Sequence, residues 1–250
     1  MNDKWALITG ASSGIGAATA ENLHGLGYKI LITGRRKERL QKMAERLGHE
    51  RVKWACFDIR KPSEIEKFIS EFRGELKNLE ILVNSAGLAK GSEKVHEAKL
   101  QDWDEMIDTN VKGLLHITRG VLPFMLANQS GHIVNLGSVA GRWTYPGGAI
   151  YCASKFAVRS FTEGLRMDLL GKKIRVSNIE PGMVNTEFGL VRFGDQKKAD
   201  EVYRGMKPLS AQDIADTISW VVQRPAHINI QEVVIYPTAQ AMVGLVHRSE

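Results

Sequence analysis

Two residues with the types and spacing for proton transfer, Tyr151 and Lys155, stand four positions apart in the sequence. A free phenol has a pKa of about 10, too high for a base near neutral pH, and a nearby ammonium lowers it by favouring the phenolate. On a helix, residues four apart lie on the same face, so the two side chains would be close in space. The pair is a candidate general acid/base, although the same spacing also occurs on amphipathic helices without chemistry.

Ser138 is the candidate partner of this pair because it follows a strand-like run and carries a short hydroxyl side chain. Its hydroxyl could meet a substrate oxygen beside the phenol and stabilise charge there. The alternative is that Ser138 is an ordinary cap or turn residue. Cys152, although adjacent to Tyr151, is interpreted as a small packing residue because no His lies near it in sequence to activate it.

The elements that must position these residues are short apolar runs alternating with longer segments of helical period, typical of βαβ units and a parallel sheet. Seven runs are expected as strands, at 5–9, 28–33, 52–57, 79–83, 132–136, 175–180 and 232–235. Helices are expected at 15–26, 38–47, 64–76, 103–126, 151–170 and 211–222. The fold class is therefore α/β, a single-domain Rossmann fold over residues 1–250, with a doubly wound seven-stranded parallel sheet and helices on both faces.

One segment breaks this alternation. From about 185 to 208 the sequence is polar, mixed in charge and interrupted by glycines. A long irregular segment after a strand end, where open parallel sheets place ligands, is predicted to be a substrate lid. The alternative is a disordered surface insertion.

A glycine-rich loop, TGASSGIG at 9–16, connects the first strand to the first helix. Its glycines permit a tight turn and a close backbone approach, and the amides at the start of the following helix can hold a pyrophosphate. The spacing of Gly10, Gly14 and Gly16 differs from the common G-x-G-x-x-G fingerprint. A plain turn between strand and helix also uses glycine.

Further motifs occur in register with this loop: Asn84-Ser85-Ala86-Gly87, Asn110, Ser138, Tyr151 with Lys155, and Pro181-Gly182. In this order and spacing the set resembles the classical short-chain dehydrogenases/reductases over essentially the whole chain. Ser85 is a departure, since the family most often has a second Asn there. The resemblance implies hydride transfer to or from a nicotinamide, for which the protein supplies a proton donor or acceptor and a stabiliser of the substrate oxygen.

The resemblance also implies roles for individual residues. The catalytic set is Asn110, Ser138, Tyr151 and Lys155: Ser138 orients the substrate oxygen, Lys155 also binds the nicotinamide ribose, and Asn110 holds a water in a proton relay. Asp58 matches an aspartate that contacts the adenine ring. The cofactor-binding residues are expected to be Gly10, Ser12, Ser13, Gly14, Ile15, Gly16, Arg35, Arg36, Asp58, Ile59, Asn84, Ala86, Gly87, Tyr151, Lys155, Pro181, Gly182, Val184 and Thr186.

The end of the second strand indicates which cofactor is used. An acidic residue there would select NAD, but the strand ends in Gly34-Arg35-Arg36. Two guanidiniums suit a 2′-phosphate, which they can bind bidentately, so NADP(H) is predicted. The alternative is that Arg35 and Arg36 begin a solvated basic helix.

The segments 141–148, 181–188, 191–193 and 225–230 resemble the branch of NADP-dependent 3-hydroxy acid dehydrogenases that act on serine, allo-threonine and related acids. The substrate carboxylate would then need a cation, for which Arg192 is the candidate, with Tyr145 lining the pocket and Ser138 and Tyr151 at the reacting carbon. The alternative for Arg192 is an ordinary loop salt bridge.

Other functions stay open at this point. A reductase of dicarbonyl, lipid or sugar carbonyls would share every motif, whereas a non-catalytic NADP-sensing protein would break the Ser/Tyr/Lys set, which is whole here. The net charge of +6 leaves a nucleic-acid binder to be considered. Six basic and two acidic residues lie within 35–46, so most of the excess charge falls beside the expected 2′-phosphate and no nucleic-acid partner is predicted.

The remaining expectations concern the setting of the protein. Two distant cysteines, no C-x-x-C pair, no signal-like amino terminus and no long apolar run favour a cytoplasmic protein without metal or membrane attachment. The apolar stretch at 241–246 is predicted to pack in a homo-oligomer, with a tetramer favoured over a dimer.

Overall fold

The computed structural model describes residues 3–249. Seven parallel strands form one sheet in the order β3-β2-β1-β4-β5-β6-β9. They are β1 (Trp5–Thr9), β2 (Lys29–Gly34), β3 (Val52–Cys56), β4 (Leu79–Asn84), β5 (Gly131–Leu136), β6 (Ile174–Pro181) and β9 (Glu232–Ile235). Every strand predicted from an apolar run is confirmed, and each end lies within one residue of its predicted position.

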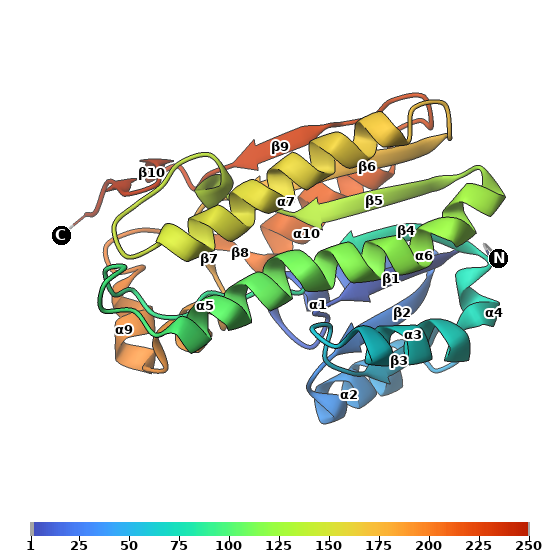
Figure 1. Ribbon diagram of the computed structural model, residues 1–250, viewed down its shortest axis with the longest axis horizontal. Helices are drawn as coiled ribbons and strands as arrows, with labels where there is room; N and C mark the ends of the chain where they lie inside the picture. Colours follow the sequence, from blue (N-terminus) through green and yellow to red (C-terminus); the bar gives the residue numbers. More distant parts are fainter. Residues whose placement is uncertain (1–2, 250) are drawn as a thin grey trace.

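Helices cover both faces of the sheet, which explains why the strands are apolar without alternation. Ala6 and Ile8 pack on α1 (Gly14–Gly25), α2 (Lys37–Leu47) and α10 (Ala211–Val222). Leu7, between them, packs on the opposite layer, which contains α3 (Pro62–Glu71), α6 (Leu114–Asn128) and α7 (Ala149–Asp168). Figure 1 shows α6 and α7 lying along the same face of the sheet. The predicted α/β Rossmann fold in a single domain is confirmed.

Two of the predicted helices are divided. The helix expected over 64–76 is α3 followed, after Phe72, by α4 (Arg73–Leu76). The helix expected over 103–126 starts as α5 (Leu100–Ile107), passes through a π-helical turn, η1 (Asp108–Gly113), and continues as α6. Single π-helical turns inside α-helices are frequent at functional sites, and this one contains Asn110.

The segment 185–208 is more regular than predicted. It contains α8 (Phe188–Phe193) and α9 (Gln196–Glu201) and is bounded by a two-stranded sheet of β7 (Val184–Asn185) and β8 (Leu209–Ser210). The carboxyl-terminal residues form a hairpin of β10 (Gln240–Met242) and β11 (Leu245–Val246). In Figure 1, α9 and β10 lie at the end of the molecule toward which the arrowheads of β5 and β9 point. The segment and the hairpin therefore gather at the carboxyl ends of the strands.

The strand order places a topological switch point between β1 and β4, because the chain builds outward to β3 and then returns to the other side of β1. The loops that leave these two strands diverge at their carboxyl ends, where open α/β sheets bind ligands. A 3-10 turn, η2 (Val139–Gly141), follows β5 on the same edge. Within residues 3–249, no helix is long and apolar enough to cross a membrane.

Candidate active site

A cavity of about 790 Å³ opens at this edge of the sheet. Its volume is within the range of sites that hold a cofactor or a drug-sized ligand. Except for Asn84 and Asn110, the residues predicted to bind cofactor or substrate or to act in catalysis all line it: Gly10, Ser12, Ser13, Gly14, Ile15, Gly16, Arg35, Arg36, Asp58, Ile59, Ala86, Gly87, Ser138, Tyr145, Tyr151, Lys155, Pro181, Gly182, Val184, Thr186 and Arg192.

The glycine loop forms the floor of the cavity by close backbone contact. Gly10 has a φ of +68°, and a Cβ on it would lie 2.8 Å from the backbone of Ala86. Gly14 has a φ of +54° and begins α1. Both conformations are open to glycine at no steric cost. The amide groups of the first turn of α1 thus face the cavity at the positive end of the helix, the arrangement that holds a pyrophosphate.

The loops after β1 and β4 are joined by one buried hydroxyl. Thr9 Oγ1 accepts hydrogen bonds of 3.1 Å from the backbone amides of both Ser85 and Ala86. Ser85, where the family more often has Asn, keeps the backbone conformation that these bonds require. The departure from the family pattern therefore leaves this loop in place against Gly10.

Tyr151, Ser138 and Lys155 meet at the middle of the cavity. Tyr151 and Lys155 lie one turn apart on α7, and the Lys155 Nζ lies 5.9 Å from the centre of the phenol ring. Lys155 is buried, and its Nζ donates a 2.8 Å hydrogen bond to the carbonyl oxygen of Leu136. Ser138 Oγ accepts a 3.1 Å bond from the Ala140 amide. The structure brings these three side chains together at the cavity, and their catalytic roles stay predictions.

Burial dominates the electrostatics of the pair Tyr151 and Lys155. Burial raises the pKa of Tyr151 well above its ordinary value, Tyr145 raises it further, and the hydrogen bond with Ser138 and the charge of Arg192 lower it only in part. Burial also lowers the pKa of Lys155, to about 8. Burial is the largest influence on the pKa of Tyr151, and the predicted lowering of this pKa by Lys155 stays a prediction. Tyr151 is thus a protonated phenol at neutral pH, suited to donate a proton.

The Asn110 side chain supports the site from behind. Only 1% of Asn110 is exposed. Its Nδ2 donates to the Leu88 carbonyl at 2.8 Å and to Ser154 Oγ at 3.0 Å, and its Oδ1 accepts from the Leu88 amide at 2.8 Å. The amide therefore ties the loop after β4 to α7. Its predicted role in a water relay stays a prediction.

Asn84 lies in the core at the end of β4, and its predicted cofactor contact stays a prediction. Only 2% of Asn84 is exposed, and its Nδ2 donates 2.8 Å hydrogen bonds to Thr118 Oγ1 and to Asn135 Oδ1. Asn135 in turn donates to Thr162 Oγ1 at 2.8 Å. The chain of amides joins β4, β5, α6 and α7, so the side chain of Asn84 stabilises the sheet.

Replacing Asn84 with Ala should lower the free energy of unfolding by about 1–3 kcal/mol, because buried oxygens of Thr118 and Asn135 lose a donor. Urea unfolding would measure this loss, with the exposed Asn128→Ala as control. The affinity for NADPH should change by less than about twofold. Weaker NADPH binding at unchanged stability would instead support the predicted direct contact of Asn84 with the cofactor.

At the far end of the cavity from Tyr151, Arg36 and Arg35 have different partners. Arg36 Nε donates to Ser12 Oγ at 3.0 Å, and an Nη of Arg36 donates to Ser13 Oγ. Arg35 instead forms an ion pair with Glu105, with 3.5 Å between Arg35 Nη1 and Glu105 Oε1. Hydroxyl and guanidinium donors that converge at the end of β2 fit a 2′-phosphate. We conclude that Arg36 is better placed for this phosphate than Arg35.

Asp58 lines the same end, but its carboxylate is held by a neighbour. Arg60 donates to Asp58 Oδ2 at 2.6 Å through Nη2 and at 2.9 Å through Nε. Burial by itself would raise the pKa of Asp58, but the hydrogen bonds and charge of Arg60 outweigh it and hold the pKa below its ordinary value. Asp58 is thus a fixed carboxylate at the cavity wall.

The other end of the cavity contains Arg192 and Tyr145. Arg192 donates to Tyr145 Oη at 3.0 Å, to the Gly91 carbonyl at 3.0 Å and to the Gly147 carbonyl at 3.4 Å. Its guanidinium also lies 5.3 Å from the centre of the Phe193 ring. Within residues 3–249 the acceptors of Arg192 are all neutral, so the alternative of an ordinary loop salt bridge is not supported.

Two groups of lining residues were not predicted. From α8 and its neighbours come Met183, Glu187, Phe188, Val191, Phe193 and Tyr203, and from the carboxyl-terminal hairpin come Val243, Val246 and Arg248. The spacing of Phe188, Val191 and Arg192 is helical and is the one sequence signal that would have found the first group. The stretch at 241–246 contributes Val243 and Val246 to the cavity wall, and its predicted packing in an oligomer stays a prediction.

Residues 4–196 match the short chain dehydrogenase family. The chain is 46% identical, over 246 residues, to the NADP-dependent 3-hydroxy acid dehydrogenase YdfG of Salmonella typhi, covering 97% of this chain and 99% of that protein. It is 45% identical, over 239 residues, to serine 3-dehydrogenase of Agrobacterium fabrum, covering 95% of each.

The fold is also similar to that of solved structures. The closed form of serine dehydrogenase complexed with NADP⁺ superposes with a TM-score of 0.93 at 44% identity, covering 98% of this chain and 100% of that one. The likeness covers the α8 and α9 segment and the carboxyl-terminal hairpin as well as the sheet.

Proposed function

The chain belongs to the short-chain dehydrogenase family and depends on NADP, and from this premise we propose that its substrate is a short 3-hydroxy acid. The enzyme transfers a hydride between the nicotinamide and the carbinol or carbonyl carbon of acids of the serine, allo-threonine and 3-hydroxypropionate type. The observation that carries this proposal is Arg192, a guanidinium on the cavity wall whose acceptors are two backbone carbonyls and a phenol.

The cofactor, when bound, supplies or accepts the hydride. In the direction of reduction, Tyr151 Oη donates its proton to the substrate oxygen, and Ser138 Oγ hydrogen-bonds the same oxygen and orients it. Lys155 places its ammonium beside the phenol and keeps a hydrogen bond to the Leu136 carbonyl. In the direction of oxidation, the phenolate accepts the proton from the carbinol.

The residues present fit a bound NADP. The amide groups at the start of α1 and the hydroxyls of Ser12 and Ser13 are donors for phosphate oxygens. Arg36 would hold the 2′-phosphate, and the nicotinamide end would contact Pro181, Gly182, Val184 and Thr186. The segment 185–208 acts as a lid, since α8 sets the Phe188 ring 5.6 Å from the ring of Tyr151.

The substrate carboxylate binds Arg192. Two further features support this assignment. Arg192 is held in position by carbonyl groups of the 90–92 and 145–148 loops, so little side-chain freedom is lost on binding. Its positive charge also reaches Tyr151, whose pKa it lowers. A substrate whose carboxylate binds Arg192 would therefore have its hydroxyl-bearing carbon near the phenol of Tyr151.

The experiment that tests the substrate class is a panel of NADP-dependent oxidations followed by absorbance. L-serine, allo-threonine and 3-hydroxypropionate should each give kcat/KM values at least about tenfold above those for neutral secondary alcohols of similar size, because a charge-assisted bidentate contact is lost in the neutral set. Equal kcat/KM across both sets would contradict the proposal.

A second candidate is a carbonyl reductase of larger, apolar substrates. The observation that favours it is the apolar wall built by Phe188, Val191, Val243 and Val246, which an unbranched acid of three carbons would only partly cover. In the same panel, NADPH-dependent reduction of alkyl ketones or dicarbonyls with higher kcat/KM than the 3-oxo acids would identify this activity.

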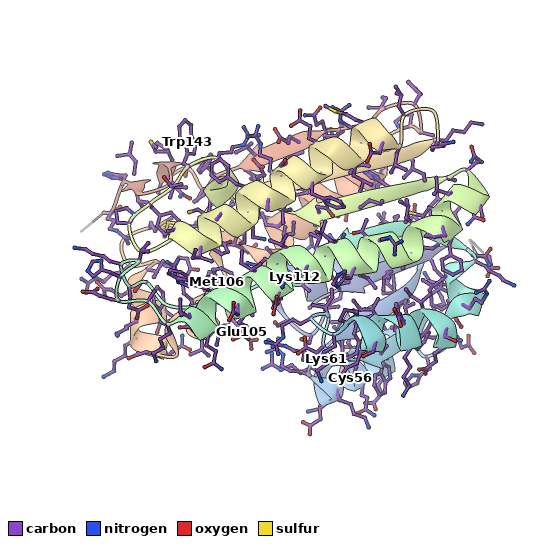
Figure 2. The ribbon with its side chains drawn as sticks, in the orientation of Figure 1. Cys56, Lys61, Glu105, Met106, Lys112 and Trp143 are labelled. Carbon is purple, nitrogen blue, oxygen red and sulfur yellow. The ribbon has the colours of Figure 1, made fainter. Side chains whose placement is uncertain are left out.

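The protein is also proposed to form a homo-oligomer in the cytoplasm. The outer face of α7 leaves Phe156 39% and Met167 58% exposed, and Figure 2 shows Trp143 projecting at the periphery of the molecule. Exposed apolar side chains on one helix favour a symmetric contact between subunits, and a tetramer is favoured over a dimer. Cys56 and Cys152 are unpaired, which fits a reducing compartment. Light scattering in solution would measure the number of subunits.

A further inference from the structure

Two arginines at the start of α2 bind one carboxylate that comes from the opposite side of the cavity. Arg36 Nη1 lies 2.6 Å from Glu187 Oε2, and Arg39 Nη1 lies 2.7 Å from Oε1 and 2.9 Å from Oε2. Both oxygens of Glu187 are thus used by guanidinium donors. Glu187 precedes α8 directly, so these contacts join the lid segment to the helix after β2.

The position of this carboxylate matters because of what else Arg36 touches. Arg36 also donates to Ser12 and Ser13 in the glycine loop, and all three residues line the cavity together with Glu187. These are the donors assigned above to the 2′-phosphate of NADP. A carboxylate on a guanidinium offers the same two-oxygen, anionic geometry that a phosphate offers.

Glu187 stays charged under all ordinary conditions. The hydrogen bonds from Arg36 and Arg39 lower the pKa of Glu187 to about 2. The side chains are only partly covered, with 41% of Arg36 and 39% of Glu187 exposed, so the ion pair is accessible to an incoming anion. Two anions that need the same guanidinium compete for it, and each weakens the binding of the other by like-charge repulsion.

We propose that Glu187 competes with the 2′-phosphate for Arg36, so that binding of NADP(H) requires the phosphate to displace this carboxylate from Arg36. Glu187 is then a specificity-determining residue for the cofactor: it weakens ligands that carry the 2′-phosphate and leaves those without it unaffected. Because Arg39 also binds both oxygens of Glu187, the lid keeps one contact with α2 after the exchange at Arg36. The inference rests on the proposed assignment of Arg36 to the phosphate.

The test is calorimetric titration of the full-length protein with 2′,5′-ADP and, separately, with 5′-ADP, which lacks the 2′-phosphate. Glu187→Gln should tighten binding of 2′,5′-ADP by about fivefold, the size expected when one or two exposed ion pairs no longer have to be broken. Binding of 5′-ADP should be unchanged. Glu187→Ala should give the same pattern, which separates loss of charge from any contact that Gln makes.

Glu201→Gln is the matched control, since Glu201 lies in the same lid segment and forms an exposed ion pair of 2.7 Å with Arg204. It should leave both affinities unchanged. Unchanged or weaker binding of 2′,5′-ADP by Glu187→Gln, or an equal gain for both nucleotides, would overturn the inference.

Arg36→Leu separates this failure from a failure of the cofactor assignment. If Arg36→Leu lowers the affinity for 2′,5′-ADP by about tenfold or more while the Glu187 variants show no gain, the phosphate site is right and competition by Glu187 is wrong. If Arg36→Leu has no effect, the phosphate binds elsewhere and both assignments fall.

Discussion

Tyr151→Phe is expected to lower kcat by about 10³-fold in both directions, the size typical of losing a positioned general acid or base. Removing the hydroxyl leaves the ring that packs against Phe188 and leaves Lys155 hydrogen-bonded to the Leu136 carbonyl. The affinity for NADPH, measured by fluorescence, should therefore change by less than about threefold. Retention of substantial kcat would show that another group transfers the proton.

The wild-type pH profile should agree with this assignment. Because burial raises the pKa of Tyr151 above its ordinary value, the phenol is protonated at neutral pH. The rate of reduction should therefore be constant up to about pH 8, where the buried Lys155 loses its proton. The rate of oxidation needs the phenolate and should rise with pH over the same interval. A reduction rate that falls between about pH 6 and 7 would point to a histidine instead.

Arg192→Ala is expected to lower kcat/KM for L-serine and 3-hydroxypropionate by about 10²-fold, mainly through KM, because the substrate carboxylate loses a charge-assisted bidentate partner. For a neutral ketone of similar size the change should be less than about threefold. Steady-state kinetics on both substrate types with the same protein preparation measures the difference.

Comparing acids with neutral ketones distinguishes loss of the carboxylate contact from a structural effect of Arg192→Ala. Arg192 also binds the carbonyls of Gly91 and Gly147, so its loss could shift the loops around Tyr151. A shift of this kind would reduce activity on acids and ketones alike, and that result would contradict the carboxylate role. Arg192→Lys, which keeps the charge without the planar fork, should recover part of the lost kcat/KM for the acids only.

Much of the molecule was predictable because its signals are local. Each strand is an uninterrupted apolar run, since both faces of the sheet are covered, and each boundary carries a glycine or a polar cluster. The pair Tyr151 and Lys155 follows from helical spacing, and the absence of an acid after Gly34 follows from reading a single strand end. In these cases the residues that decide the outcome are within a few positions of one another.

Asn84 and Asn110 show where this kind of prediction stops. Their identities match the family motif, but whether an amide faces a cavity or the core depends on partners such as Asn135, Leu88 and Ser154, which lie on other elements. The pKa of Tyr151 is another case. Sequence showed the nearby ammonium, whereas the amount of surrounding protein, which raises the pKa, is a property of the packed fold.

Sequence by itself therefore determined the sheet, the helices, the position of the glycine loop and the residue types of the acid/base set. Tertiary structure alone decided that Glu187 lies on Arg36 and Arg39, about 150 positions away in sequence, and that Val243 and Val246 complete the wall of the cavity. The physical reason is the distance along the chain over which each kind of interaction acts. Backbone propensity and periodicity act over one or two turns, whereas charge pairing and desolvation act between any groups that folding brings together.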